Sequence, residues 1–170
     1  MAKEFVRKPR EREQDEFQQK LLEVRRVTKV VKGGRTLRFS ACVIVGDKNG
    51  RVGMGTGRAA EVPVAVEKAA KAARKQTINV PIIDGTLPHE ANGKFSTSKV
   101  TMIPTKKGNG IIAGGAVRSI VELAGYKDIT TKIHGSSNKI NTAHATLNAL
   151  KTLRTREQVA ELRGKSVEEI

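Results

Sequence analysis

The side chains of this chain that could do chemistry are mostly cations, and many of them gather in one stretch. From Val24 to Gly46 the sequence holds six basic residues and no acid. These residues are Arg25, Arg26, Lys29, Lys32, Arg35 and Arg38. A run of like charge repels itself unless a partner neutralises it, so the run favours a dense polyanion, with RNA as the first candidate. The chemistry expected here is ionic recognition of phosphate.

Basic residues elsewhere are expected to extend this contact. A helix over 62–76 would bring three lysines to one edge, at spacings i, i+3 and i+7. A solvated outer face is the alternative reading of that edge. A glycine pair at the centre of the run and further cations complete the candidate RNA-binding set: Gly33, Gly34, Arg51, Arg58, Lys68, Lys71, Lys75, Lys106 and Lys107.

A glycine-rich loop offers a second kind of chemistry, the binding of phosphate by backbone N–H groups. Gly108, Gly110 and Ala113 match the dinucleotide pattern G-x-G-x-x-G/A, and Asp128 lies 20 residues after Gly108. An early Pro104, two neighbouring lysines and the short remaining chain all disfavour a nucleotide site. The loop is then either an ordinary flexible connection or one whose N–H groups hold an RNA phosphate or a protein carboxylate.

No other motif predicts catalysis or a metal site. The segment 164–166 reads Gly-Lys-Ser like the end of a P-loop, but the required first glycine is Val159. The three histidines (His89, His134 and His144) show no metal-ligand spacing with one another or with Cys42. Glu122 and Asp128 come closest to a carboxylate pair, and solvation near a helix end explains them equally well.

Composition agrees with a polyanionic partner. The formal net charge is +15 and the pI is near 10.3, which is typical of nucleic-acid binders and less often of proteins that bind anionic membranes. Aromatic residues make up only 3%, which disfavours a base-stacking platform. A single cysteine excludes an internal disulfide, and no apolar run approaches the ~20 residues of a membrane span, so we expect a cytoplasmic protein.

The first half of the chain predicts three strands and a helix. The glycine pair makes the turn of a hairpin, and Leu37 to Val45 alternates as a strand with one buried face. A turn over 47–50 leads to a third strand, which three glycines loosen, and then to the helix over 62–76. The charged residues before this unit predict a flexible arm with a short helix near Phe17 to Leu22.

The second half predicts strands alternating with helices. A strand is expected from Val100 to Ile103, a helix from Gly115 to Ala124 that Gly125 ends, and a strand from Tyr126 to Ile133. Further elements are a helix over 138–150 and a short last helix that a capping box of Thr155 and Gln158 begins and Gly164 ends. The Pro- and Gly-containing segment before them is the expected domain boundary, with a short strand over 80–83 as an option.

Several segments, in order along the chain, resemble the bacterial small-subunit ribosomal protein S5 family. They cover 29–35, 45–47, 50–55, 61–65, 110–115, 135–138 and 163–169. The resemblance runs from about Leu21 to the last residue. It implies an α+β protein of two small domains: an N-terminal double-stranded-RNA-binding-like β-β-β-α module and a C-terminal ribosomal-protein-S5-domain-two-like β/α domain related to GHMP kinases. The divisions it suggests are an arm (1–15), the first domain (16–79), a linker (80–93), the second domain (94–154) and a C-terminal helix and tail (155–170).

The resemblance also implies a function. Such a protein is a structural constituent of the small ribosomal subunit, without catalysis, cofactor, metal, membrane or small-molecule substrate. Its hairpin loop would reach 16S rRNA near the neck, close to where spectinomycin binds. It would stabilise the head relative to the body and contribute to translational accuracy near the mRNA entry.

The same resemblance implies two protein neighbours and leaves two alternatives. Ribosomal protein S4 would lie against Gly108, Gly110 and Arg118, and ribosomal protein S8 against Arg163 and Lys165. One alternative is a GHMP-like phosphotransferase that uses the glycine loop. The other is a free-standing regulator that binds double-stranded RNA of any sequence.

Overall fold

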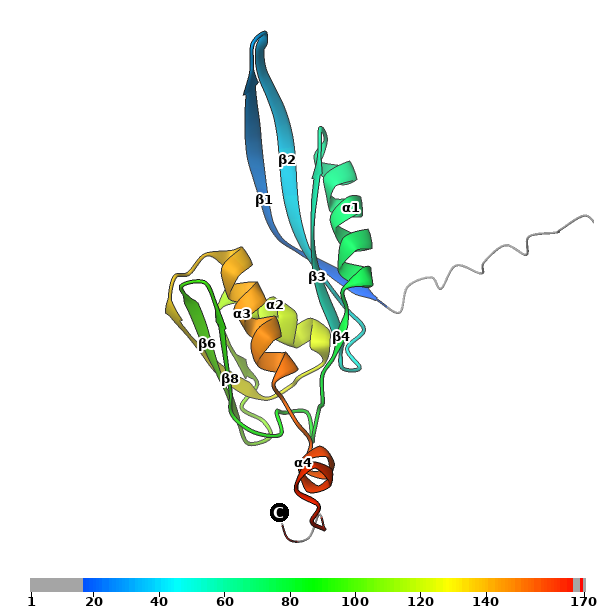
Figure 1. Cartoon of the computed structure of the whole chain (residues 1–170), viewed down its shortest axis with the longest axis vertical. Coiled ribbons are helices and arrows are strands. Elements are labelled where there is room, and N and C mark those ends of the chain that lie inside the picture. Colours follow the sequence, from blue (N-terminus) through cyan, green and yellow to red (C-terminus); the bar gives the residue numbers. More distant parts are fainter. Residues whose placement is uncertain (1–16, 167–168, 170) are drawn as a thin grey trace, which may run out of the picture.

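The computed structural model describes residues 17–166 and 169, so the arm expected over 1–15 lies outside the described residues. Two four-stranded sheets and four helices make up the described part (Figure 1). The first sheet has the order β1-β2-β3-β4, with strands Gln18–Val31, Gly34–Gly46, Arg51–Ala59 and Ile78–Asn79. Helix α1 (Val62–Lys75) covers one of its faces. The predicted β-β-β-α order is confirmed.

The second half forms the other sheet and three helices. Its order is β5-β6-β8-β7, with strands Ala91–Phe95, Ser98–Pro104, Ile129–Gly135 and Ile111–Ile112. Only β7 pairs in parallel, with β8. Helices α2 (Gly115–Ala124) and α3 (Lys139–Lys151) lie between the two sheets, and α4 (Arg156–Arg163) extends away from the second domain (Figure 1).

Glycines on β3 let α1 approach the first sheet closely. Gly53, Gly55 and Gly57 alternate along the strand, and a Cβ on any of them would overlap the backbone of α1. Alanines at every fourth position of α1 face them: Ala65, Ala69 and Ala73, all buried. Two residues of strand span about 6.7 Å and four of helix about 6 Å, so the two small-residue rows stay nearly in step. The three glycines therefore let the backbone of α1 pack directly on β3.

Strand β2 is buried on both faces from Ala41 to Gly46, where its alternation predicted one buried face. Ala41, Val43 and Val45 pack under α1, as expected. Cys42 and Ile44, on the opposite face, belong to a second cluster that includes residues of α2. The prediction was wrong on this point because the C-terminal domain covers the face that the alternating sequence predicted to be exposed to solvent.

The two domains share that second cluster and several backbone hydrogen bonds. The N–H groups of Lys48 and Gly50 donate to the carbonyl oxygens of Leu123 and Ala124, both at 2.9 Å. A Cβ at Gly46 would overlap the backbone of Leu123, so these segments touch directly. Burial raises the pKa of the Cys42 thiol in this cluster to about 11, with the charge of Glu23 adding to the effect. The expectation that Cys42 is a packing residue is confirmed.

Local signals for helix ends are confirmed. Gly125 adopts the left-handed conformation that ends α2, with φ 104°. Asn138 caps α3 by accepting from the N–H groups of Ile140 and Asn141. Thr155 and Gln158 form the predicted capping box of α4, and Gly164 ends that helix with φ 63°.

Three expectations about strands and helices were wrong. The helix near Phe17 to Leu22 is the start of β1, because pairing with β2 overrides the local preference. The linker over 80–93 stays a prediction, and its last three residues belong to β5, which pairing with β6 and close packing of Gly93 on α3 stabilise. The optional strand over 80–83 is only an isolated bridge from Ile83 to Thr86. Strand β8 begins at Ile129, since the buried Tyr126 side chain donates to the Pro81 carbonyl oxygen.

Candidate nucleic-acid interface

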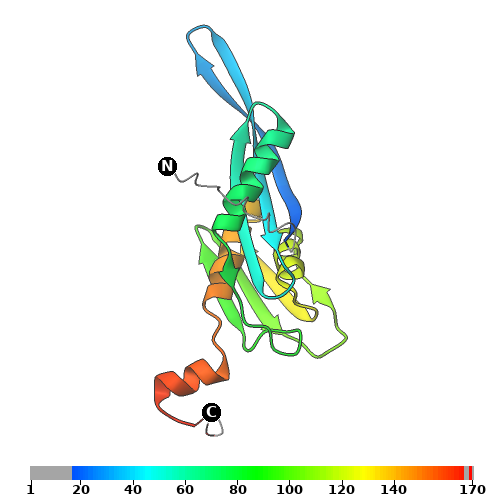
Figure 2. The same cartoon turned by 90° about the vertical axis from the view of Figure 1, so that its right-hand side faces the viewer.

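The hairpin of β1 and β2 projects beyond the rest of the first domain (Figures 1 and 2). Every residue over 28–38 is exposed. Val31 pairs with Gly34, so Lys32 and Gly33 form the tip. Gly34 has φ 141°, a conformation that other residues rarely adopt, which explains a glycine there. The structure thus presents the cationic run on a two-stranded arm with solvent on both sides.

Strand register sorts the hairpin cations onto two faces. Arg26 lies opposite Phe39 and Arg35 lies opposite Val30, so these two arginines share the α1 side of the sheet. The other face carries Arg25, Lys29 and Arg38, and Arg58 follows on β3, opposite Ser40. A shallow groove of about 410 Å³ runs over this second face. Its lining is Val27, Thr28, Lys29, Val31, Thr36, Arg38 and Arg58.

Most of the candidate cations have no acidic partner within residues 17–166. Four predicted RNA-binding residues do have one: Arg25 with Glu23, Arg51 with Asp47, Lys71 with Glu67, and Lys107 with Asp84. The others form no ion pair in this part of the chain: Arg26, Lys29, Lys32, Arg35, Arg38, Arg58, Lys68, Lys75 and Lys106. The hairpin tip is therefore uncompensated positive charge.

Arg51 has a structural contact that the sequence did not indicate. Its Nε donates to Oδ2 of buried Asp47 at 2.8 Å, and its guanidinium lies 5.4 Å from the centre of the Phe17 ring. Asp47 also accepts from the N–H groups of Asn49 and Arg51. Burial alone would raise the pKa of Asp47, but these hydrogen bonds and the guanidinium lower it. Arg51 thus stabilises the turn between β2 and β3.

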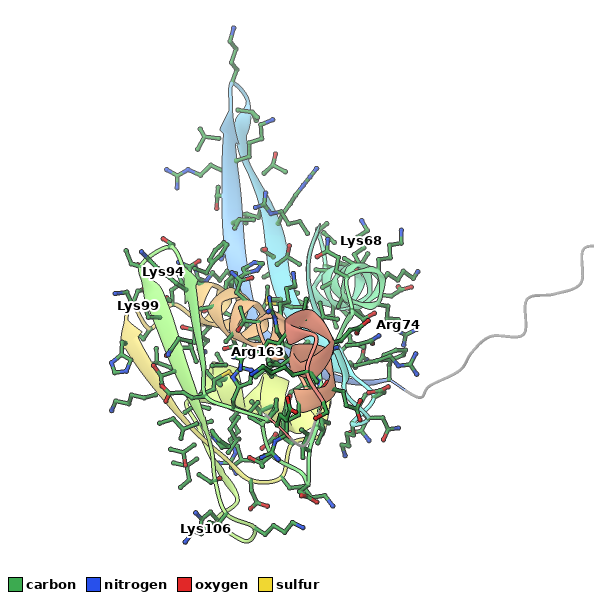
Figure 3. The ribbon with its side chains drawn as sticks, turned by 60° about the horizontal axis from the view of Figure 1, so that its bottom comes forward. Lys68, Arg74, Lys94, Lys99, Lys106 and Arg163 are labelled. Atoms are coloured by element: carbon green, nitrogen blue, oxygen red, sulfur yellow. The ribbon has the colours of Figure 1, made fainter. Side chains whose placement is uncertain are left out.

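The lysine edge of α1 is exposed, as its spacing predicted. Lys68 points outward from α1, on the same helix as Arg74 (Figure 3). Lys71 donates to Glu67 at 2.6 Å, and this hydrogen bond lowers the pKa of Glu67. An exposed pair of this kind is weak, so a phosphate could compete for Lys71.

The glycine loop binds an internal carboxylate. The N–H groups of Gly108 and Gly110 donate to Oδ1 of Asp128 at 2.9 and 2.8 Å. Asp128 is 8% exposed, so the residue that a dinucleotide site would use for ribose is turned into the protein. The N–H groups that a nucleotide phosphate would need are occupied. Of the readings that the sequence left open, the loop that holds a protein carboxylate is the one found, and the carboxylate belongs to this chain.

Arg118 lies in a three-residue ionic cluster across the two domains. Its Nε donates to Glu122 Oε1 at 2.8 Å, and Lys20 Nζ of β1 donates to Glu122 Oε2 at 2.8 Å. Hydrogen bonds from Lys20 and Arg118 lower the pKa of Glu122. Arg118 itself stays exposed on the surface of α2, together with the open loop positions Gly108 and Gly110.

The residues expected to face a second protein neighbour lie at the end of α4. Arg163 is its last residue, and Lys165 follows the glycine that ends the helix. Both are exposed, and Leu162, directly before Arg163, is 68% exposed. Figure 3 shows Arg163 on α4, away from the hairpin.

Sequence reasoning missed a group of basic residues on the second sheet. Lys94, Lys99, Lys132 and His134 all lie on its outer face. Their spacing along the chain shows no cluster, because they come from three strands. The available signal was the absence of acids from the residues that form β5, β6 and β8.

Neither a metal-ligand cluster nor a membrane-length apolar helix occurs in the part of the chain that the structure describes. Over residues 17–166, no three His, Cys, Asp or Glu side chains gather where they could hold a metal ion. None of the helices within those residues has the length and apolar character to span a membrane. His144 stacks on Phe95 with ring centres 4.5 Å apart, and burial, with a smaller effect of Lys151, lowers its pKa. Its expected role in packing is confirmed.

Comparison with known proteins gives consistent matches to both domains. Residues 17–81 match the family model "Ribosomal protein S5, N-terminal domain" and residues 93–163 match "Ribosomal protein S5, C-terminal domain". A relative from Mycoplasmopsis agalactiae, described as small ribosomal subunit protein uS5, is 55% identical over 157 residues. The aligned region covers 92% of this chain and 68% of that protein.

Proposed function

This chain belongs to the ribosomal protein S5 family, and on that premise we propose that it binds 16S rRNA through the β1–β2 hairpin. Membership makes it a structural, non-enzymatic constituent of the small subunit of the cytoplasmic ribosome. The proposal concerns what membership leaves open, namely which surface of this chain contacts RNA and how.

The observation that carries the proposal is the uncompensated charge on the projecting hairpin. Lys29, Lys32 and Arg35 are exposed and form no ion pair within residues 17–166. Their mutual repulsion costs stability in the free protein, and phosphates relieve it on binding. With aromatic residues at 3% of the chain, contacts to phosphate and sugar are the recognition mode available.

The cationic groove on the second hairpin face supports a contact longer than the tip. Lys29 and Arg38 of the hairpin and Arg58 of β3 line it together. Cations along two sides of a narrow groove can hold successive phosphates of one strand. Lys68 and Lys75 of α1 offer a further edge on the opposite face of the first sheet.

We further propose that two surfaces contact neighbouring proteins. The exposed Gly108, the half-buried Gly110 and Arg118 would face ribosomal protein S4, and Arg163 with Lys165 would face ribosomal protein S8. Stabilisation of the head relative to the body and an effect on translational accuracy would follow from the RNA and S4 contacts together. The exposed apolar Leu162 on α4 supports a protein neighbour at the second surface.

Arg118 tests the S4 surface without disturbing the fold. Replacing Arg118 with alanine is expected to lower affinity for ribosomal protein S4 about tenfold, the loss of one charged contact. The melting temperature of the free chain should stay within about 2 °C of wild type, because Lys20 still pairs with Glu122 and exposed pairs contribute little. Titration calorimetry and circular dichroism measure the two effects. Gly110 is a poorer test because its φ of 71° strains any side chain.

A binding comparison tests the RNA proposal. The full chain is expected to bind 16S rRNA at least about tenfold more tightly than a generic RNA duplex at the same salt concentration. Filter binding over a salt series measures both affinities and both salt slopes. Equal affinity for the two RNAs would identify a general duplex binder and overturn the proposal.

A further inference from the structure

Strand register brings two lysines and a histidine of the second sheet into one row. Lys94 of β5 lies directly opposite Lys99 of β6, and Lys99 lies directly opposite His134 of β8. All three are exposed and lie on the face away from α3, since Gly93 and Val100 on the other face are buried. Lys94 and Lys99 project from neighbouring strands in Figure 3. We call these three residues the cationic row.

The next row of the same face adds polar groups. Asn92, Thr101 and Lys132 lie opposite one another across β5, β6 and β8. Thr101 Oγ1 donates to Asn92 Oδ1 at 2.7 Å, which places both side chains on the outer face. The face therefore offers cations, a hydroxyl and an amide over two adjacent rows.

The cationic row has no internal partner to explain it. The strands β5, β6, β7 and β8 contain no acid, and neither Lys94, Lys99 nor Lys132 forms an ion pair within residues 17–166. Glu90 lies before β5, at the opposite end of that strand from Lys94, and accepts a weak hydrogen bond from Asn92. Like charges directly opposite on neighbouring strands destabilise a sheet. The free protein therefore bears a cost that a bound anion would remove.

Protection of a sheet edge does not explain the row. Lysine on an edge strand prevents unwanted pairing with another strand, and this accounts for Lys94 on β5. It does not account for Lys99, because β6 pairs with β5 on one side and with β8 on the other at that residue. It does apply to Lys132, because β7 pairs with β8 only at Ile129 and Thr130. The cations also extend over two rows, as a contact surface requires.

We propose that this outer face of the second sheet binds an RNA backbone, with Lys94, Lys99 and Lys132 on phosphates. The inference rests on the proposed function, since it takes RNA as the polyanion. Thr and Asn beside Lys are the usual partners of phosphate and ribose oxygens, including the 2′-hydroxyl. An acidic protein segment is the other anion that could pair with these lysines, and the cross-linking experiment below distinguishes it from RNA.

The outer face of the second sheet lies on the opposite side of the molecule from α1. The first sheet, the helices α2 and α3, and the second sheet follow one another as layers, with α1 outside the first sheet (Figure 1). The outer face of the second sheet therefore points away from α1 and from the lysine edge of that helix. One chain would hold separate RNA segments on opposite sides.

Two double variants test the proposal in the full chain. Lys94→Gln/Lys99→Gln removes two charges from the cationic row, and Lys127→Gln/Lys151→Gln removes two exposed charges from elsewhere in the second domain. Each protein is bound to small-subunit particles that lack this protein, over a salt series. The row variant is expected to reduce the log–log salt slope by about 1–2 and the control variant to leave it unchanged. The row variant should also melt about 1–3 °C higher in free form, because the repulsion is gone.

Ultraviolet cross-linking identifies the partner. A nucleotide on the peptide that spans 91–103 supports the proposal, and a cross-link from that peptide to an acidic protein segment overturns it. Equal salt slopes for row variant and wild type also overturn it. A variant of the hairpin tip is measured in parallel. If the hairpin variant lowers the salt slope and the row variant does not, the proposed hairpin contact stands and only the contact at the second sheet is overturned.

Discussion

Replacing Lys29, Lys32 and Arg35 with glutamine is expected to weaken binding to 16S rRNA about 100-fold near 0.15 M salt. Each phosphate contact contributes about 0.7–0.9 to the log–log salt slope, so three lost contacts lower the slope by about 2–3 and the affinity by about two orders of magnitude. The variant should fold normally, since all three side chains are exposed and form no ion pair in residues 17–166. Filter binding from 50 to 400 mM salt, roughly the range over which such slopes are read, measures both quantities.

A control variant with the same loss of charge makes this result interpretable. Lys127, Lys139 and Lys151 are exposed residues of the second domain, and their replacement with glutamine lowers net charge equally. The control should bind 16S rRNA nearly as tightly as wild type. If both variants lose the same affinity, the contact is diffuse attraction by net charge, and the hairpin has no special part in it.

Gly55→Ala is expected to destabilise the free chain by about 3 kcal/mol. The added methyl group would overlap the carbonyl oxygen of Ala69 and the backbone of Ala73, and a backbone cannot yield as a side chain can. For a chain of 170 residues the melting temperature should fall by roughly 6–12 °C. Thermal unfolding followed by circular dichroism measures the change.

Gly115→Ala adds the same methyl group where there is room for it. No heavy atom lies within 4 Å of its Cβ position, and the residue opens α2. Alanine has the higher helix propensity, so the control should be neutral or slightly stabilising. Equal losses of stability for Gly55→Ala and Gly115→Ala would mean that α1 does not depend on close backbone packing against β3.

Helix ends that depend on residues close in sequence were predicted well. The ends of α2 and α4 follow from Gly125, the pair Thr155 and Gln158, and Gly164, all within a few residues of the helix they end or begin. The start of β1 was predicted as helix because only its partner β2, more than twenty residues along the chain, makes it a strand. Packing between the two domains likewise buries the second face of β2, which the sequence of the strand alone did not predict. The glycines of β3 were taken as weak points of a strand because the helix above them could not be seen.

The same distinction applies to the candidate interface. The hairpin cations could be grouped from the sequence because they lie close together along the chain, on either side of one turn. The row of Lys94, Lys99 and His134 was not, because it depends on the order of strands β5, β6 and β8. The dinucleotide pattern had the right spacing for a phosphate loop, and only the structure shows Asp128 in place of the phosphate.

The hydrophobic cluster shared by the two domains crosses the boundary between the two family models. The family models end and begin at residues 81 and 93, as if the halves were independent modules. A chain cut there would leave Cys42, Ile44 and Met54 facing water, because their cover comes from the other half. The boundary between the two family models is therefore not a boundary in the packing of the protein. Either half alone would expose this apolar surface to water. During synthesis, that face of the first domain is covered only after the second domain has been made.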